Sequence, residues 1–326
     1  MDAWNRLRRR ILTPDTGQTK LSTRGFHLKD ERARDHLETV GGSFLRGFAA
    51  AAEADGPPEA APTVEATPAA YRGFAYEGAA MAFAIRDALP GRRRRLVARF
   101  LADHDEHVYM AYVGVGWAMA RLPRPLWSRL DAPDPLLRWL VLDGYGFHQA
   151  YFRTDRYVHA QYLPGSFPWP ADGSRGYALR AIDQGIGRAC WFVAGTDPER
   201  LVYLLDAFPA HRRSDLYAGA GLAVCYAGGA TEQELTWLAE VAGAYRGDLA
   251  QGVAFGAAAR HRAGLVLPHN ELATRIFCGM PVPEATRVTD EARAGLPADD
   301  VLPAYEIWRQ RIRNAFAPVA SDTKAE

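Results

Sequence analysis

Acidic and amide side chains recur beside a glycine along the middle of this sequence. They stand at or next to the position before the first glycine of a repeated Gly-x-Gly or Gly-x-Ala frame: Glu77, Asp143, Asp183, Gln184 and Gln251. His148 and Arg188 follow about one helical turn later. Carboxylates near a histidine and an arginine can transfer protons or hold a polar ligand. We therefore take Glu77, Asp143, His148, Asp183 and Arg188 as catalytic candidates, with Asp143 and His148 as the pair to test first.

A structural interpretation of the same residues stays open, in which each pairs with a neighbouring helix end or arginine so that its buried polar group is satisfied. Aromatic and amide side chains on the same stretches are candidates for substrate binding: Tyr76, Trp117, Phe147, Tyr151, Gln184, Trp191 and Gln251. They suit an apolar ligand, although aromatic residues of a helical protein more often belong to the core.

Other patterns that carry chemistry are weak. His104 and His107 are three residues apart, but the His-Glu-x-x-His spacing of zinc proteases is absent, and we predict no metal site and no cofactor. A phosphate-binding Gly-x-Gly turn follows a strand and occurs once, whereas this frame is repeated without a strand. The widely spaced Cys190, Cys225 and Cys278 stand in apolar segments, which predicts buried, reduced thiols.

The elements that position these residues are indicated by the glycine repeat. The first glycines of the frame are residues 78, 114, 144, 185, 219 and 252, so the steps are 36, 30, 41, 34 and 33 residues. In one copy, Thr231 and Glu234 form a capping box before an apolar helical face, and Gly228 and Gly229 end the helix before it. A unit of about 34 residues with two helices is typical of tetratricopeptide-type repeats.

This spacing predicts an all-α fold, a single large domain of stacked helix hairpins that forms a tetratricopeptide-like right-handed solenoid. We expect an N-terminal extension, helix and linker over residues 1–70, with the Pro- and Ala-rich residues 53–70 exposed and residues 20–26 extended. The helical repeats then span residues 71–285, with an aromatic, proline-rich insertion over 153–177. A capping helix and a disordered tail follow over residues 286–326.

Composition restricts the partners. The 39 Lys and Arg residues balance 38 Asp and Glu residues, so no overall field attracts nucleic acid or a membrane. No apolar stretch is long enough for a transmembrane segment, and the start lacks a secretion signal, so we expect a cytoplasmic protein. Residues 4–12 predict an amphipathic helix that rests on the domain or on a membrane surface.

Several stretches resemble the UNBL family of bacterial enediyne biosynthesis: Leu12-Thr-Pro-Asp15, Arg24-Gly-Phe-His27, Leu37-Glu-Thr-Val-Gly41, Arg72-Gly-Phe-Ala-Tyr-Glu-Gly-Ala-Ala-Met81, Asp143-Gly-Tyr-Gly-Phe-His148, Asp183-Gln-Gly-Ile-Gly-Arg188 and Tyr305-Glu-Ile-Trp-Arg309. The resemblance implies a cytoplasmic accessory role beside an iterative polyketide synthase, in the conversion of a linear polyene into the enediyne core. It implies no particular catalytic residues.

Two functions follow from these observations. In the first, the array binds or modifies an apolar polyene, or a related polyketide intermediate, held in a channel with the polar residues as its working groups. In the second, it is a non-catalytic scaffold whose concave face binds another protein of the enediyne pathway. A closed tunnel lined by aromatic side chains with a few buried carboxylates favours the first, and an open, solvated groove favours the second.

Overall fold

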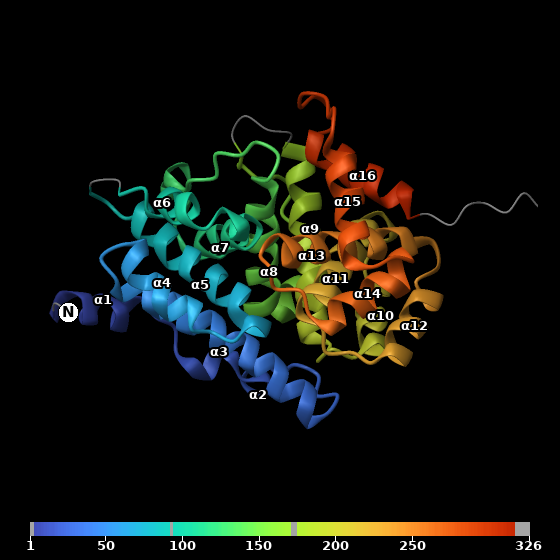
Figure 1. The fold of residues 1–326 in the computed structure, drawn as a ribbon, viewed down its shortest axis with the longest axis horizontal. Coiled ribbons are helices and arrows are strands. Elements are labelled where there is room, and N and C mark those ends of the chain that lie inside the picture. The colour runs from blue at the N-terminus through green and yellow to red at the C-terminus, as the bar shows by residue number, and fades with distance from the viewer. Residues whose placement is uncertain (1–2, 92–93, 171–174, 317–326) are drawn as a thin grey trace, which may run out of the picture.

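The glycine frame lies on a series of long helices that pack side by side in chain order. In the computed structural model, which describes residues 3–91, 94–170 and 175–316, every regular element is helical. The frame helices are α5 (Ala69–Ala88), α7 (Val108–Arg121), α8 (Trp139–Phe152), α9 (Arg175–Val193), α11 (Ala210–Ala227) and α13 (Arg246–Arg262). Each contacts the next (Figure 1). The predicted all-helical stack is therefore confirmed.

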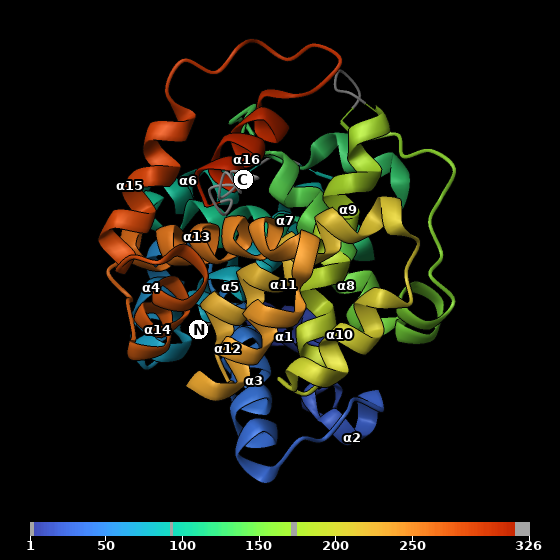
Figure 2. The same ribbon diagram turned by 90° about the vertical axis from the view of Figure 1, so that its right-hand side faces the viewer.

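Shorter elements connect and cover the frame helices (Figure 2). The covering helices are α4 (Pro57–Glu65), α6 (Leu96–Asp103), α10 (Pro198–Asp206), α12 (Glu232–Val241) and α14 (Pro268–Cys278). Short turns of other helix types occupy Asp105–His107, Arg124–Arg129, Asp155–His159 and Gly243–Tyr245. In the described connections before and after α8, the helical elements are short turns of this kind. The predicted capping box of Thr231 and Glu234 is present at the start of α12.

The small residues of the frame lie where neighbouring frame helices touch. The first glycine faces the preceding helix and the second faces the following one, so Gly144 abuts the carbonyl of Val113 and Gly146 abuts that of Ile182. The pairs Gly114 and Gly116, Gly185 and Gly187, and Gly219 and Gly221 alternate in the same way. A Cβ atom at any of these positions would lie 2.3 Å or less from that carbonyl oxygen. Only glycine allows backbones to approach so closely.

The array begins one helix earlier than the repeat indicates. Helix α3 (Glu31–Glu53), capped by Asp30, packs along α5. Its Gly47 abuts the carbonyl of Ala75, and Gly78 on α5 abuts that of Phe44. Helix α3 is the first of the series and has only a following neighbour. It therefore needs only the second glycine of the pair, and the two-residue frame cannot be recognised in its sequence. Helix α3 therefore belongs with the repeats, although the expected boundary at residue 70 separates it from them.

The array curves until its late helices meet its early ones. The guanidinium of Arg260 on α13 donates to the carbonyls of Ala69 and Ala70 at the start of α5, at 3.4 and 3.0 Å. The ring of Tyr226 on α11 packs edge-on against Phe74 on α5, with centroids 5.3 Å apart. The inner surface is consequently enclosed between helices.

Two local predictions differ from the structure. Residues 57–65 form α4, with Pro57, Ala60 and Val64 buried, instead of an exposed linker. Prolines at the first two helical positions are compatible with helix initiation, since those N–H groups need no partner within the helix. The expected extended piece near residues 20–26 is instead helical, with a 3-10 turn over Thr16–Thr19 followed by α2 (Leu21–Arg24).

The first helix, α1 (Ala3–Leu12), rests against the end of α3. Arg8 donates to the carbonyls of Ala52, Glu53 and Ala54, at 2.6 to 2.8 Å, and so satisfies groups that the end of α3 leaves without a partner.

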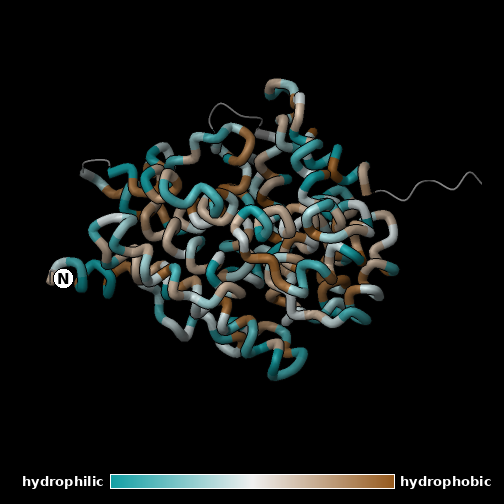
Figure 3. The backbone as a smooth tube through the Cα atoms, viewed as in Figure 1, coloured by the Kyte–Doolittle hydropathy of each residue, from teal (hydrophilic) through white to brown (hydrophobic). Residues whose placement is uncertain are grey.

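Stretches of apolar and polar residues alternate along the chain (Figure 3). No helix within the described ranges combines the length and apolar character needed to cross a bilayer.

The C-terminal helices pack across α13. They are α15 (Val282–Arg293) and α16 (Ala304–Ala315), and α16 points Tyr305, Glu306 and Arg309 into the protein interior. The expected disordered tail, residues 317–326, lies outside the described residues. In the aromatic insertion, Phe167 is buried and stacks on Trp127, whereas Tyr162 is exposed, so the insertion contributes single side chains to the core.

Candidate functional site

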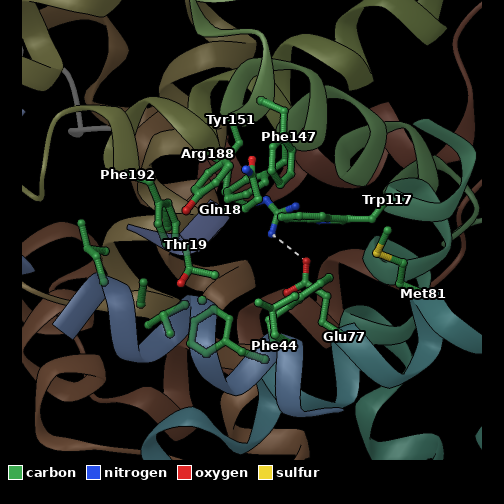
Figure 4. Close-up of a pocket in the computed structure, with 18 of the residues that line it drawn as sticks. Gln18, Thr19, Phe44, Glu77, Met81, Trp117, Phe147, Tyr151, Arg188 and Phe192 are labelled. Carbon is green, nitrogen blue, oxygen red and sulfur yellow. Dashed lines mark ion pairs between the residues drawn. The ribbon is translucent and has the colours of Figure 1, made fainter. Parts of the chain in front are cut away.

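A narrow slot lies inside the curved array, between α3, α5, α7, α8, α9 and α11. Most of its wall is apolar and aromatic, with Phe44, Met81, Trp117, Phe147, Tyr151 and Phe192 around the space (Figure 4). Pro14, Gln18 and Thr19, from the segment that follows α1, complete the lining. The slot is thus formed by residues that the curvature brings together from distant parts of the chain.

The dimensions of the slot suit a slender ligand. It encloses about 790 Å³ of empty space, including its opening to solvent. The side chains leave only a small part of this space wide enough for a water molecule, so the slot is narrow. A linear or flat molecule fits such a shape better than a bulky one.

Charged groups from three helices meet at the inner wall of the slot. Nη1 of Arg188 lies 4.0 Å from Oε1 of Glu77, the pair joined by a dashed line in Figure 4. Nη2 of Arg188 lies 2.7 Å from Oδ1 of Asp143. Asp143 also accepts a hydrogen bond of 2.9 Å from Gln184. All four residues are at most 5% exposed, so the cluster is shielded from solvent.

Three polar atoms at this wall have no hydrogen-bond partner among the described residues. They are Nε of Arg188, the hydroxyl of Tyr226, and Oε1 of Glu77, whose distance to Arg188 is 4.0 Å. Glu77, Arg188 and Tyr226 line the slot directly. Buried polar groups are normally satisfied. An incomplete set of partners at a cavity wall is therefore the feature expected where a ligand supplies the remaining ones.

Burial controls protonation at this site. It raises the pKa of Glu77 to about 7, against the opposing effect of the Arg188 charge and with a smaller contribution from Asp143. Burial also raises the pKa of Asp143. A carboxyl group whose pKa lies near neutrality can both donate and accept a proton. The arrangement can therefore perform acid–base chemistry or bind a polar group within an apolar slot.

The Glu77→Gln variant is expected to change how stability depends on pH. Native Glu77 holds its proton up to about pH 7, whereas the unfolded chain releases it near the ordinary value of 4.5. The contribution of Glu77 to stability therefore falls by about 3 kcal/mol as the pH rises through this window and stays constant above it. Glutamine does not titrate, so the variant should gain that amount relative to the native protein. Urea unfolding of both proteins across the window measures the difference.

Glu291→Gln serves as the matched control for this experiment, because the side chain of Glu291 is 63% exposed and forms a surface ion pair with Arg287. Its stability should follow the native pH profile. Parallel profiles for the native protein and Glu77→Gln would contradict a protonated, buried Glu77.

The predicted polar wall is only partly assembled. Glu77, Asp143, Arg188 and Gln184 come together, and three of the predicted aromatic residues, Trp117, Phe147 and Tyr151, line the slot. Asp183 points away and accepts hydrogen bonds of 3.0 and 2.6 Å from Arg212. Gln251 accepts one of 3.0 Å from Arg309. These two side chains are thus hydrogen-bonded to arginines on other helices and do not join the cluster.

Asp143 and His148, the two candidates chosen for the first test, form no hydrogen bond with each other in the described part of the chain. Both ring nitrogens of His148 lack a hydrogen-bond partner among the described residues, and the ring packs against Trp117 and Phe152. The two residues are five apart, which places them on different sides of the helix. Burial lowers the pKa of His148 to about 3, so its ring is neutral.

Two further candidates for binding lie outside the slot. Tyr76 points toward the ends of α4 and α6, where its hydroxyl donates to Glu65 of α4 and lies 3.1 Å from Nδ1 of His104, just after α6. Trp191 donates its indole N–H to the carbonyl of Gly228 and closes the end of α11. His107 stacks on Tyr76, so neither histidine of the weak metal pattern forms part of a metal cluster in the described residues. The three cysteines are buried and free, as predicted.

Other lining residues were not singled out by the sequence. They come chiefly from α3, including Leu37, Val40 and Phe44, and from α11, including Leu222 and Tyr226. The apolar periodicity of α3 was visible, but it indicates only a buried face. Since helix α3 carries a single glycine of the frame, nothing in its sequence placed that face opposite Arg188.

Comparison with known proteins places the chain in a family. Residues 3–316 match the family described as "Protein of unknown function (DUF1702)". No curated protein and no solved structure matches the chain. Because the match spans nearly every residue, this chain belongs to the DUF1702 family.

Proposed function

We propose that this protein is an accessory protein of enediyne biosynthesis that binds, and during core formation acts on, the polyene made by a polyketide synthase. The narrow aromatic slot inside the array is the observation that carries this proposal. The enediyne assignment comes from the resemblance of the sequence motifs to UNBL proteins.

The slot and a conjugated polyene share shape and chemistry. A conjugated chain is linear and flat, so it fits a space that is narrow in cross-section and enclosed by rings. Aromatic side chains provide large apolar contact areas and ring faces for such a chain. Enclosure between helices also keeps water from a reactive ligand. Glu77, Arg188 and Asp143 supply polar groups at one point of an otherwise apolar wall.

The scaffold alternative receives less support. A protein-binding repeat array presents an open concave face, whereas this array curves until Arg260 on α13 contacts the start of α5. Its inner surface includes a cavity with a mainly apolar lining, which favours a small apolar ligand over an extended protein partner.

Binding of the synthase-derived polyene to the purified protein tests the proposal. The absorption and fluorescence of the polyene should change on transfer to the aromatic slot, and chromatography of the extracted ligand reports any conversion. Ala223 lines the slot, so Ala223→Phe fills part of the narrow space and should weaken binding by about tenfold or more, the effect of about 1.4 kcal/mol.

Ala102→Phe is the matched control, because Ala102 lies exposed on the outer helix α6 and the added ring reaches no part of the slot. Binding should be unchanged in this variant. Thermal unfolding shows whether each variant is folded. Absence of polyene binding to the folded native protein, or equal binding by both variants, would contradict the proposal.

A further inference from the structure

The slot wall carries buried hydrogen-bond donors that lack a partner in the described part of the chain. Nε of Arg188 and the hydroxyl of Tyr226 have no hydrogen-bond partner among the described residues, and both side chains are at least nine-tenths buried while lining the slot. Oε1 of Glu77 is also without a partner. Guanidinium nitrogens only donate, whereas a tyrosine hydroxyl donates and accepts. An acceptor oxygen on the ligand would therefore complete this site.

Arg188 stands between two apolar cavities. A second, smaller cavity, lined by Met110, Val113 and Phe255 among others, shares Arg188, Leu222 and Tyr226 with the slot. Burying the Nε–H group of Arg188 without a hydrogen-bond partner is energetically unfavourable, because water that would normally solvate it is largely excluded. A ligand that carries both an apolar chain and an oxygen satisfies both parts of the wall.

The local charges determine which oxygen fits. The groups that face Arg188 are two carboxyls, Glu77 from α5 and Asp143 from α8, and the uncharged Tyr226 from α11. Behind Asp143 lie the uncharged Gln184 and, hydrogen-bonded to Gln184, Tyr305 from α16. A ligand carboxylate would add a third acidic group to one guanidinium in a buried place, where unpaired charge is strongly unfavourable.

We infer that the slot takes a linear apolar chain bearing an uncharged oxygen function, a carbonyl or a hydroxyl, whose oxygen accepts a hydrogen bond from Arg188. This inference rests on the proposed binding of a slender apolar ligand and specifies the class to which that ligand belongs. A hydroxyl could also donate to Oε1 of Glu77. The chain then extends along the rings of Trp117 and Phe147, which lie beside Arg188 in the slot (Figure 4).

A free acid should bind, if at all, in the opposite direction. Arg121 also lines the slot and is exposed, so it marks the side that faces solvent. A carboxylate can remain hydrated there while its chain enters the slot. The exposed Arg121 and the buried Arg188 therefore distinguish a charged group at the opening from an uncharged one inside.

Four probes built on one linear conjugated polyene test the inference: the methyl ketone, the primary alcohol, the parent hydrocarbon and the carboxylic acid. Fluorescence titration of the full-length protein at slightly alkaline pH gives the four affinities. The ketone and the alcohol should bind about tenfold more tightly than the hydrocarbon, the scale of a hydrogen bond to a charged donor. If the hydrocarbon binds equally well, the inference fails while the proposed function stands.

Two arginine variants locate the oxygen. Arg188→Lys keeps a positive charge beside Asp143 but removes the Nε donor, and it should abolish the preference for ketone and alcohol over hydrocarbon. Arg121→Gln should leave that preference intact and weaken only the acid. The inference is wrong if Arg188→Lys weakens binding of the acid while Arg121→Gln leaves that binding unchanged.

These measurements distinguish failure of the inference from failure of the proposed function. If none of the four probes binds the folded native protein, the proposed function fails together with the inference. The comparison of the four probes on the native protein needs no variant, so a poorly folded Arg188→Lys protein would not remove the test.

Discussion

Replacing Gly219 by alanine is expected to destabilise the protein by about 3 kcal/mol or more, the upper part of the range for overpacked cores. A Cβ atom at this position would lie 1.8 Å from the carbonyl oxygen of Gln184 on α9. That oxygen is backbone, so it cannot move aside as a flexible side chain can. Helices α9 and α11 would have to separate, and the contacts along their whole interface would loosen. Chemical denaturation followed by circular dichroism measures the loss.

The sign of this effect separates packing from helix propensity. In an exposed helix, changing glycine to alanine stabilises by up to about 1 kcal/mol. Gly42 on α3 provides the matched control, because a Cβ atom there would meet no atom within 4 Å. Gly42→Ala should leave the protein as stable as the native form or more stable. Similar changes in the two variants would mean that the glycine frame does not determine how closely the helices approach.

The second large effect is expected at Asp183. Asp183 and Arg212 are each at most 4% exposed and form two hydrogen bonds, so Asp183→Ala leaves a buried guanidinium without its carboxylate. Breaking a buried pair in this way costs about 3–5 kcal/mol. Asp183 lies outside the slot, so the folded variant should bind polyene as the native protein does. Equilibrium unfolding and ligand titration provide the two readouts.

Removing both charges should be less harmful than removing one. In the double variant Asp183→Leu with Arg212→Met, apolar side chains replace the pair and no uncompensated charge stays buried. We expect this protein to be more stable than Asp183→Ala. An Asp183→Ala variant of native stability that has lost polyene conversion would instead assign Asp183 to the chemistry.

The candidate site could be predicted only in part from the polar residues beside the glycines. Glu77 and Asp143 were recognisable because the frame places them at equivalent positions on successive helices, and Arg188 because it follows by one turn. Asp183 and Gln184 are adjacent in the sequence, yet Gln184 joins Asp143 while Asp183 joins Arg212. A rotation of about 100° between neighbouring helical residues separates their directions.

The helical frame was present in the amino-acid sequence, since glycines at a regular interval specify where backbones touch and which helices are neighbours. A local signal such as the capping box at Thr231 acts within a few residues and was equally readable. The slot itself depends on curvature, which accumulates from small rotations between successive helices and carries no local signature. Only folding brings Tyr226 against Phe74 and Arg260 to the start of α5, and so encloses Arg188 and Glu77 in an apolar space.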